Sequence, residues 1–313
     1  MNPNRLQTYL KEKIGKKSSL VLRCLEKEKI SFIFSNETGY PKSLLTLSRP
    51  PEVLYYKGNL KEWPRSLAVV GSRKNTPYGQ MAASALISGL KNTDITIISG
   101  LAYGIDCIAH NAALVNNLTT VAVLGSGIDE KSLYPKTAHS LAAQILLRDG
   151  CILSEFPPLT PPLPQNFPQR NRIISGLSRA VVVIEAAKKS GALITARLAL
   201  EHGKDIFALP GNIFEKNSFI PNMLIQKGAF PVTDSQDILD YFGIVLQKSD
   251  NRQFALSEDE KKIVSGLSSA PLYIDEIVRN CGLETHSARS LISILEIKKI
   301  IIDTGGKNYI LIS

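Results

Sequence analysis

The sequence predicts an α/β protein built on an extended parallel sheet. Between residues 67 and 232, short apolar runs alternate with glycine-containing turns and helical stretches. Most runs lack polar alternation, which is typical of strands buried on both faces, and the repeated strand–helix order favours parallel crossovers. The predicted fold is therefore a Rossmann-like sheet, in which ligands bind beyond the carboxyl ends of the strands. The runs are LAVVG (67–71), ITIISG (95–100), TTVAVLG (119–125), CILSE (151–155), AVVVIEA (180–186), DIFALPG (205–211) and AFPV (229–232).

Four segments follow one another along the chain. Residues 1–30 predict one or two short basic helices, and residues 31–246 form the predicted sheet domain. Within that domain, Val53–Lys57 is expected to add an edge strand. Residues 247–254 have the polar composition of a linker, so residues 255–313 are expected to form a separate small domain.

The last segment has the pattern of a winged helix. Ser257 precedes acidic residues at a predicted helix start, Pro271–Cys281 predicts a second helix, and a third is expected from Thr285 to about Lys299. The turn at residues 304–307 joins two apolar runs and predicts a hairpin. Three short helices closed by a hairpin are typical of this helix-turn-helix variant.

Composition excludes several classes of protein. Of the 313 residues, 44% are apolar and 21% charged, and the mean hydropathy is +0.01, which excludes a disordered chain. No apolar run reaches about 18 residues and no signal peptide is visible, so a cytosolic protein is expected. The four cysteines form no C-x-x-C pair, which favours reduced thiols over a disulfide framework or structural zinc.

The net charge of +9 is unevenly distributed. Residues 1–30 carry eight basic and three acidic side chains, whereas residues 255–313 carry seven basic and eight acidic ones. The positive field therefore lies outside the C-terminal segment. A polyanionic partner is one interpretation, because basic excess attracts phosphate backbones. The other interpretation is that the basic excess serves only to keep the protein soluble.

Small residues follow two predicted strands in a way that suits phosphate. Gly71-Ser72-Arg73 places backbone N–H groups and a guanidinium at a helix start, and Ser99–Asp106 repeats the arrangement. A composite pocket is expected, although each turn alone is also compatible with a tight connection that binds nothing. Asp106 and His110 are one helical turn apart and are expected to brace the turn rather than to perform acid–base chemistry.

A proline-rich stretch carries an aromatic residue beside two arginines. Phe156–Ser175 has six prolines between Pro157 and Pro168, which predicts a stiff, extended lid rather than sheet or helix. Phe167 beside basic residues has the composition of a single-strand stacking site, with a core plug as the alternative. Lysines follow another strand at 188–189, so a cationic rim along the strand ends is expected.

No cofactor or metal is expected. Gly125-Ser126-Gly127 is followed by Glu130 where the dinucleotide fingerprint needs glycine, which disfavours NAD. No phosphate-binding P-loop or G-x-S-x-G elbow occurs, and the four histidines lack metal-ligand spacing.

These blocks together resemble the DNA processing protein A (DprA/Smf) family over roughly residues 31–242. The resemblance implies a non-catalytic protein that binds single-stranded DNA, protects incoming strands and loads the RecA recombinase in natural transformation, acting as a homodimer. It rests on VGSR (70–73), SGLAYGID…AH (99–110), TVAVLGSGID…YP (120–135), LSEFPP (153–158), FPQRNRIISGLSRAVVVIEA (167–186), SGALITARLALEHGKDIFALPG (190–211) and LIQKGA (224–229).

The resemblance also implies where DNA would contact the chain. Phe167 would be the stacking residue, and the phosphate-contacting candidates are Gly71, Ser72, Arg73, Ser99, Gly100, Ala102, Arg170, Asn171, Lys189, Ser190 and Gly191. An irregular apolar stretch after the sixth predicted strand is expected to supply the dimer interface. Its residues are Ile213, Phe214, Phe219, Ile220 and Met223.

Two other functions remain as alternatives. Nucleotide-cleaving enzymes of the lysine-decarboxylase-like group share a similar sheet, but their P-G-G-x-G-T motif is absent because Pro210-Gly211 is followed by Asn212. A transcription factor acting through the winged helix is disfavoured by that segment's excess of one acidic residue, eight against seven basic. Residues 255–313 are expected instead to serve as a protein-contact or regulatory module.

Overall fold

The computed structural model describes residues 3–245, 256–267, 271–298 and 300–311. The chain divides into two compact units, Met1–Val245 and Leu246–Ser313. The predicted linker at 247–254 lies outside the described residues. Among the helices that are described, none is long and apolar enough to cross a membrane.

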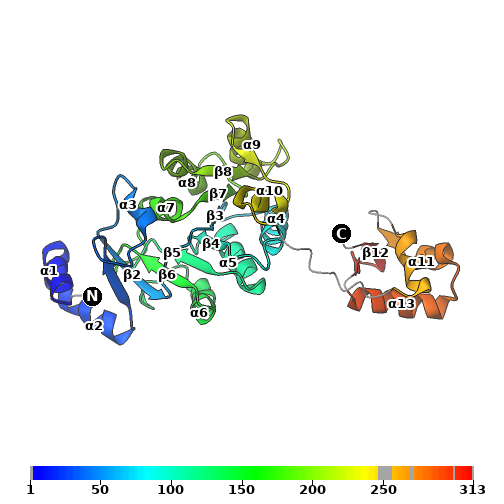
Figure 1. Ribbon diagram of the computed structural model, residues 1–313, viewed down its shortest axis with the longest axis horizontal. Helices are drawn as coiled ribbons and strands as arrows, with labels where there is room; N and C mark the ends of the chain where they lie inside the picture. Colours follow the sequence, from blue (N-terminus) through cyan, green and yellow to red (C-terminus); the bar gives the residue numbers. More distant parts are fainter. Residues whose placement is uncertain (1–2, 246–255, 268–270, 299, 312–313) are drawn as a thin grey trace. The chain divides into compact units, whose positions relative to one another are not determined.

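The first unit contains a nine-stranded sheet, counted over the described residues (Figure 1). The strand order is β1-β2-β6-β5-β4-β3-β7-β8-β9, and every pairing from β6 to β9 is parallel. This confirms the predicted Rossmann-like parallel sheet. The strands are β1 (Ser31–Phe34), β2 (Val53–Gly58), β3 (Ser66–Val70), β4 (Thr96–Ser99), β5 (Thr120–Val123), β6 (Cys151–Ser154), β7 (Ala180–Val183), β8 (Asp205–Ala208) and β9 (Phe230–Pro231).

The sheet differs from the prediction at one end. The strand expected at Val53–Lys57 is β2, but it is not an edge strand, because it pairs antiparallel with both β1 and β6. Its residues Val53, Leu54 and Tyr55 are all buried. The edge position belongs to β1, which was not predicted as a strand and pairs only with β2 among the described residues.

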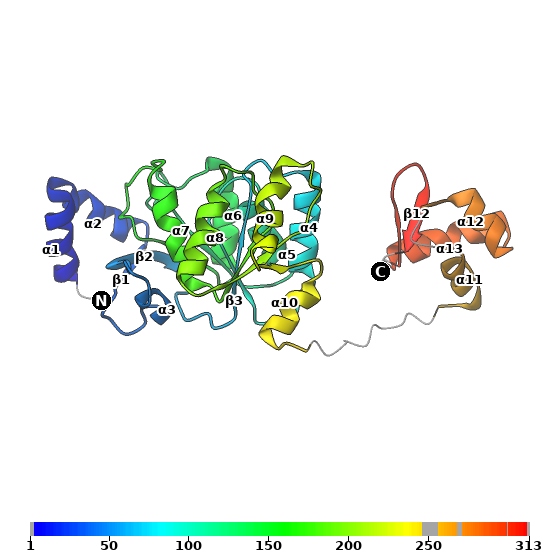
Figure 2. The same ribbon diagram turned by 90° about the horizontal axis from the view of Figure 1, so that it is seen from above.

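Helices cover both faces of this sheet, as Figures 1 and 2 show. Strand alternation divides the core: Val121 and Val123 of β5 pack with the helices of one face, whereas Ala122 and Leu124 pack on the other. The first face carries α3 (Lys42–Leu45), α7 (Asn166–Leu177), α8 (Gly191–Glu201) and α9 (Phe219–Gln226). The remaining helices of the sheet region are α4 (Pro77–Ser88), α5 (Ile105–Val115), α6 (His139–Leu147) and α10 (Ser235–Phe242), with short 3-10 turns at Lys136–Ala138 and Lys216–Ser218.

The basic N-terminal segment forms two helices that pack on the same unit. They are α1 (Pro3–Ile14) and α2 (Ser18–Lys27), joined by a 3-10 turn at Gly15–Lys17. Leu6 and Leu10 are fully buried and share a hydrophobic cluster with residues of α6. The helices bury their apolar stripe there, which leaves their lysines exposed.

The proline-rich stretch is partly helical, which corrects the prediction of an extended lid over Phe156–Ser175. Residues 156–165 contain no helix or strand, but α7 begins at Asn166. Pro168 is the third residue of α7, where the missing N–H would have no partner inside the helix in any case. Proline is therefore tolerated there, and Arg170 and Asn171 are helical residues.

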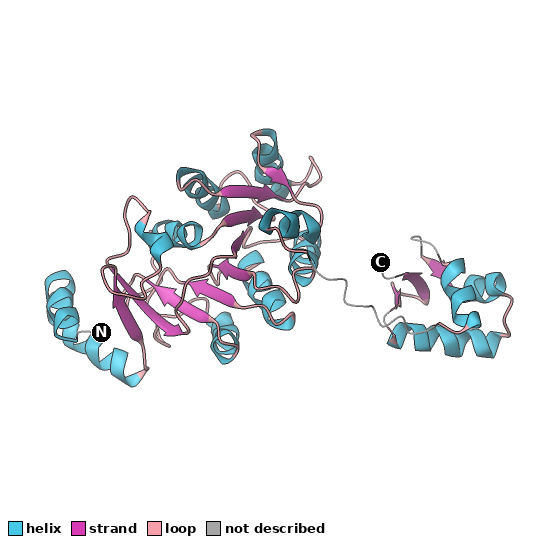
Figure 3. Cartoon of the chain, in the orientation of Figure 1, coloured by secondary structure: helices cyan, strands magenta, loops and turns pink. Residues whose placement is uncertain are grey.

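The second unit is a winged helix, and its described residues form a small three-stranded sheet of order β10-β12-β11. Its strands are magenta in Figure 3. Its first helix begins after Ser257 as predicted, with a capping box between Ser257 and Glu260. The second helix begins later than predicted, because Leu272–Tyr273 pairs with β12 instead. The elements are α11 (Glu258–Gly266), β10 (Leu272–Tyr273), α12 (Ile274–Cys281), α13 (Thr285–Ile297), β11 (Ile301–Asp303) and β12 (Asn308–Leu311).

Candidate nucleic-acid interface

The sheet brings the small-residue turns of the sequence to one edge. Strands β5, β4, β3 and β7 are consecutive neighbours, and all are parallel. Their carboxyl ends therefore open on the same side, where the turns after each strand lie next to one another.

Two glycines allow these turns to pack closely. A Cβ on Gly104 would overlap the carbonyl oxygen of Ser72, and Gly104 has φ +76°, a conformation that other residues rarely adopt. A Cβ on Gly100 would overlap the guanidinium of Arg170. Because both glycines lack a side chain, the turns after β3 and β4 can lie close to each other, and Arg170 of α7 can approach the turn after β4.

Arg170, which the resemblance names as a phosphate-contacting candidate, lies beneath the turns and not on the surface. It is 3% exposed. Its Nη1 donates hydrogen bonds to the carbonyl oxygens of Gly100, at 2.7 Å, and Val123. Burial lowers the pKa of Arg170 to about 10, which still leaves the side chain charged at neutral pH. Arg170 joins the ends of β4 and β5 to α7.

Asp106 holds the turn after β4 from the helix side. Its Oδ2 accepts hydrogen bonds from the backbone N–H groups of Gly100 at 3.1 Å and Ala102 at 3.3 Å. Burial raises the pKa of Asp106, and the positive charge of Arg170 opposes that rise. The carboxylate therefore lies in a network that supports the turn.

His110 makes a different contact from the one considered in the sequence. Its Nδ1 lies 2.7 Å from the hydroxyl of Thr120 rather than against Asp106. The ring is fully buried, and burial lowers the pKa of His110 to about 3. A neutral, enclosed imidazole is unsuited to acid–base chemistry near neutral pH.

A cluster of three aromatic rings and one arginine lies above this network. The Arg73 guanidinium carbon is 5.0 Å from the centre of the Phe167 ring. The rings of Phe167 and Tyr134 are 6.1 Å apart, and those of Tyr134 and Tyr103 are 6.0 Å apart. Arg73 is exposed, Tyr103 is 43% exposed and Tyr134 is 38% exposed. We call Arg73, Tyr103, Tyr134 and Phe167 the first stacking cluster.

The two tyrosines were not predicted as site residues. Both occur in the family-like blocks, in the turns that follow β4 and β5. The sequence does contain an indication of this role. Each tyrosine has an aromatic ring with a polar hydroxyl and lies in the turn after a buried strand, outside the apolar run that forms the core.

The other predicted residues divide into exposed and internal ones. Lys189 and Gly191 are exposed and Ser190 is half-buried before α8, where the Ser190 hydroxyl accepts from the Ala192 N–H. Gly71 and Ala102 are also half-buried. Internal bonds occupy the rest: Ser72 accepts from Lys74 N–H, Ser99 donates to the Val69 carbonyl oxygen, and Asn171 donates to the Gly191 carbonyl oxygen.

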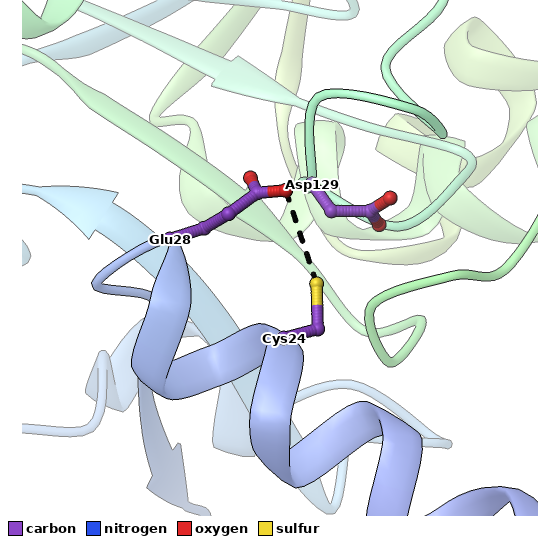
Figure 4. A group of neighbouring side chains, drawn as sticks. All are labelled: Cys24, Glu28 and Asp129. Carbon is purple, nitrogen blue, oxygen red and sulfur yellow. Dashed lines mark hydrogen bonds between the residues drawn. The ribbon is translucent and has the colours of Figure 1, made fainter.

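One cluster elsewhere has the composition of a metal site. Cys24, Glu28 and Asp129 bring their ligand atoms within 4.8 Å of one another (Figure 4). The carboxylates already have partners, since Glu28 pairs with Lys57 at 2.9 Å and Asp129 accepts from two backbone N–H groups. Burial raises the pKa of Cys24 to about 11, so the thiol stays protonated. These contacts join the end of α2 to the loop after β5.

Comparison with known proteins identifies the family. Residues 31–243 match the family model for DNA recombination-mediator protein A, and residues 247–306 match the DprA winged helix domain. The chain belongs to the DNA recombination-mediator protein A family.

Several relatives resemble it strongly. Protein Smf of Escherichia coli is 45% identical over 217 residues, which cover 69% of this chain but only 58% of that protein. The DNA processing protein DprA of Streptococcus pneumoniae is 45% identical over 205 residues, covering 65% of this chain and 71% of the relative.

Two solved structures share the fold. The X-ray structure of Streptococcus pneumoniae DprA matches with a TM-score of 0.64 and 43% identity, covering 69% of this chain and 76% of that one. A structure of DNA processing protein A from Helicobacter pylori matches with a TM-score of 0.61 and 31% identity, covering 68% and 95%. The latter was described for its single-stranded DNA binding mode.

Removing the Asp106 carboxylate should destabilise the site from within. In Asp106→Ala, the N–H groups of Gly100 and Ala102 lose their acceptor and the buried charge of Arg170 loses its compensation. We expect the free energy of unfolding to fall by about 3–5 kcal/mol in urea titrations. Asp94→Ala is the control, because Asp94 is exposed in a surface pair with Arg65 and should cost about 0–1 kcal/mol. Equal losses in the two variants would contradict the role assigned to Asp106.

Proposed function

We propose that this chain binds single-stranded DNA, without sequence specificity, along the carboxyl edge of its sheet. The observation that carries the proposal is the first stacking cluster, in which Arg73 lies 5.0 Å from the Phe167 ring beside two exposed tyrosines. Aromatic faces can stack on any unpaired base, and a neighbouring guanidinium can pair with phosphate. Both features lie where ligands bind in sheets of this type.

In the cell, we propose a role in recombination without catalysis. Family membership supports the view that the chain protects incoming single strands in the cytoplasm and loads RecA onto them during natural transformation. The single-stranded DNA binding mode described for the Helicobacter pylori relative supports the choice of ligand. No observation favours the nucleotide-cleaving alternative, since Asp106 and His110 are buried among structural contacts.

We also propose that the chain acts as a homodimer through the loop after β8. Ile213 is 81% exposed and Phe214 is 88% exposed. Ile220 and Met223 were predicted in the same interface, but Ile220 is buried in the hydrophobic core and Met223 packs against it. Ile220 should be removed from the predicted interface, whereas the half-buried Met223 stays in the proposed interface.

Arg73→Ala should weaken binding to every single-stranded sequence. Loss of one phosphate contact should lower the slope of log K against log salt by about 0.7. The measurement is fluorescence anisotropy with labelled oligonucleotides at several salt concentrations. Arg65→Ala is the matched control, because Arg65 is an exposed arginine just before β3, whereas Arg73 follows that strand. An unchanged slope in a folded Arg73→Ala variant would remove Arg73 from the site.

Phe167→Ala should cost about 1–3 kcal/mol of binding free energy if the ring stacks on a base. Phe167 is half-buried and packs beside Gly125, so thermal unfolding must be measured on the same samples. A lower melting temperature with unaltered affinity would show that the ring fills space under the loop and does not contact DNA.

Phe214→Asp should dissociate the proposed dimer. A charge placed in an apolar contact must be desolvated without a partner, whereas in the monomer this largely exposed position should tolerate it. Sedimentation at tens of micromolar should give a dimer for the parent chain and a monomer for the variant. A parent chain that sediments as a monomer would refute the proposal.

A further inference from the structure

A second cation–aromatic pair lies along the same edge of the sheet. The Lys188 ammonium nitrogen is 4.4 Å from the centre of the Phe219 ring. Lys188 is exposed in the turn after β7, and Phe219 begins α9 with 43% of its surface exposed. This pair repeats the combination seen in Arg73 and Phe167, where a cation also lies over an accessible ring.

Backbone hydrogen bonds fix the second pair in place. The Ile220 N–H donates to the Ala186 carbonyl oxygen at 3.0 Å, and the Ala186 N–H donates to the Asn217 carbonyl oxygen at 2.7 Å. The start of α9 is therefore held beside the end of β7. These bonds hold the backbone on either side of Phe219 close to the turn that carries Lys188.

A further bond connects the second pair to the turn that carries Arg73. The Asn217 side-chain amide donates to the Lys74 carbonyl oxygen at 2.8 Å. Lys74 is the residue after Arg73, so both pairs belong to one continuous surface. Its ionisable side chains favour an anion: Lys74, Lys188, Lys189 and Lys216 are exposed, against Glu215. Glu185 is 3% exposed and is occupied by bonds from Thr76.

The distance between the two aromatic positions suits one strand of DNA. Phe167 packs over Gly125 at the end of β5, and Phe219 lies beside the end of β7. The order β5-β4-β3-β7 separates them by three strand spacings, or roughly 14 Å at about 4.8 Å each. That distance corresponds to about four nucleotides at the stacked rise of about 3.4 Å, and to fewer in an extended strand.

We propose that Lys188 and Phe219 form a second nucleotide site on the same DNA strand. This inference rests on the proposed single-stranded DNA binding and extends it past the first stacking cluster. Phe219 stacks on a base, and Lys188 contacts a neighbouring phosphate. Phe219, predicted from the sequence as an interface residue, is thereby assigned to DNA, whereas Ile213 and Phe214 remain available to a second copy of the chain.

The test compares a thymidine dodecamer with a 5′-phosphorylated thymidine dinucleotide. Only the dodecamer is long enough to occupy both sites, and the dinucleotide should prefer the first stacking cluster, which has three rings. We expect Phe219→Ala to weaken dodecamer binding at least about fivefold and to leave dinucleotide binding unchanged. Arg73→Ala should weaken both. Lys188→Gln should lower the salt slope by about 0.7 for the dodecamer alone.

Two further variants control for folding and for the loss of an exposed ring. Phe219→Tyr keeps the aromatic face and should retain dodecamer affinity. Phe230→Ala removes a ring of similar exposure, 50%, from the outer strand β9 and should change neither affinity. Thermal unfolding and sedimentation of every variant accompany the binding measurements.

Several outcomes would overturn the second site. Undiminished dodecamer affinity in Phe219→Ala would exclude stacking there, and equal losses for both oligonucleotides would place the ring in the first site. A monomeric Phe219→Ala variant whose parent is a dimer would assign the ring to the interface between copies. If Arg73→Ala and Phe167→Ala bind both oligonucleotides normally, the proposed function itself fails, whatever Phe219 does.

Discussion

The buried guanidinium of Arg170 is the contact on which the rest of the candidate site depends. By donating to the carbonyl oxygens of Gly100 and Val123, it fixes the ends of two adjacent strands relative to α7. Phe167 lies in the first turn of the same helix, three residues before Arg170. The hydrogen bonds of Arg170 therefore also fix the helical turn that carries the Phe167 ring. Burying an arginine is costly, and the Asp106 carboxylate nearby offsets part of that cost. The buried guanidinium of Arg170 therefore holds the backbone in place. The exposed side chains above it are the ones accessible to a ligand.

The sequence predicted the central strands well because each is a local apolar run that needs no distant partner to be recognised. The prediction was wrong where the place of a strand in the sheet depends on pairing with a strand far along the chain. Val53–Gly58 reads as a strand, but only its pairing with Cys151–Ser154 shows that it is internal. The proline-rich stretch failed for another reason: composition indicates extended backbone on average, whereas a helix accepts proline in its first turn, as at Pro168.

The residues of the candidate site were predicted in part, and the errors in that prediction share one cause. Motif position identifies which residues gather at the strand ends, but it does not say whether a side chain points into the turn or out of it. Arg73 and Arg170 look alike in the sequence, yet Arg73 is exposed and Arg170 is 3% exposed. The same limit hid Tyr103 and Tyr134, whose proximity to Phe167 depends on loops from different strands.

The proposed preference for single strands over duplex has a physical reason. In a duplex the base faces are stacked on one another, so a protein ring can reach them only by unstacking a step, which costs a few kcal/mol. A single strand offers its base faces freely, and rings in loops such as those of Tyr103, Tyr134 and Phe167 can meet them. In the proposed complex, Arg73 would add an attraction to phosphate that both forms share. Aromatic contact therefore distinguishes the two forms of DNA, whereas positive charge alone would not.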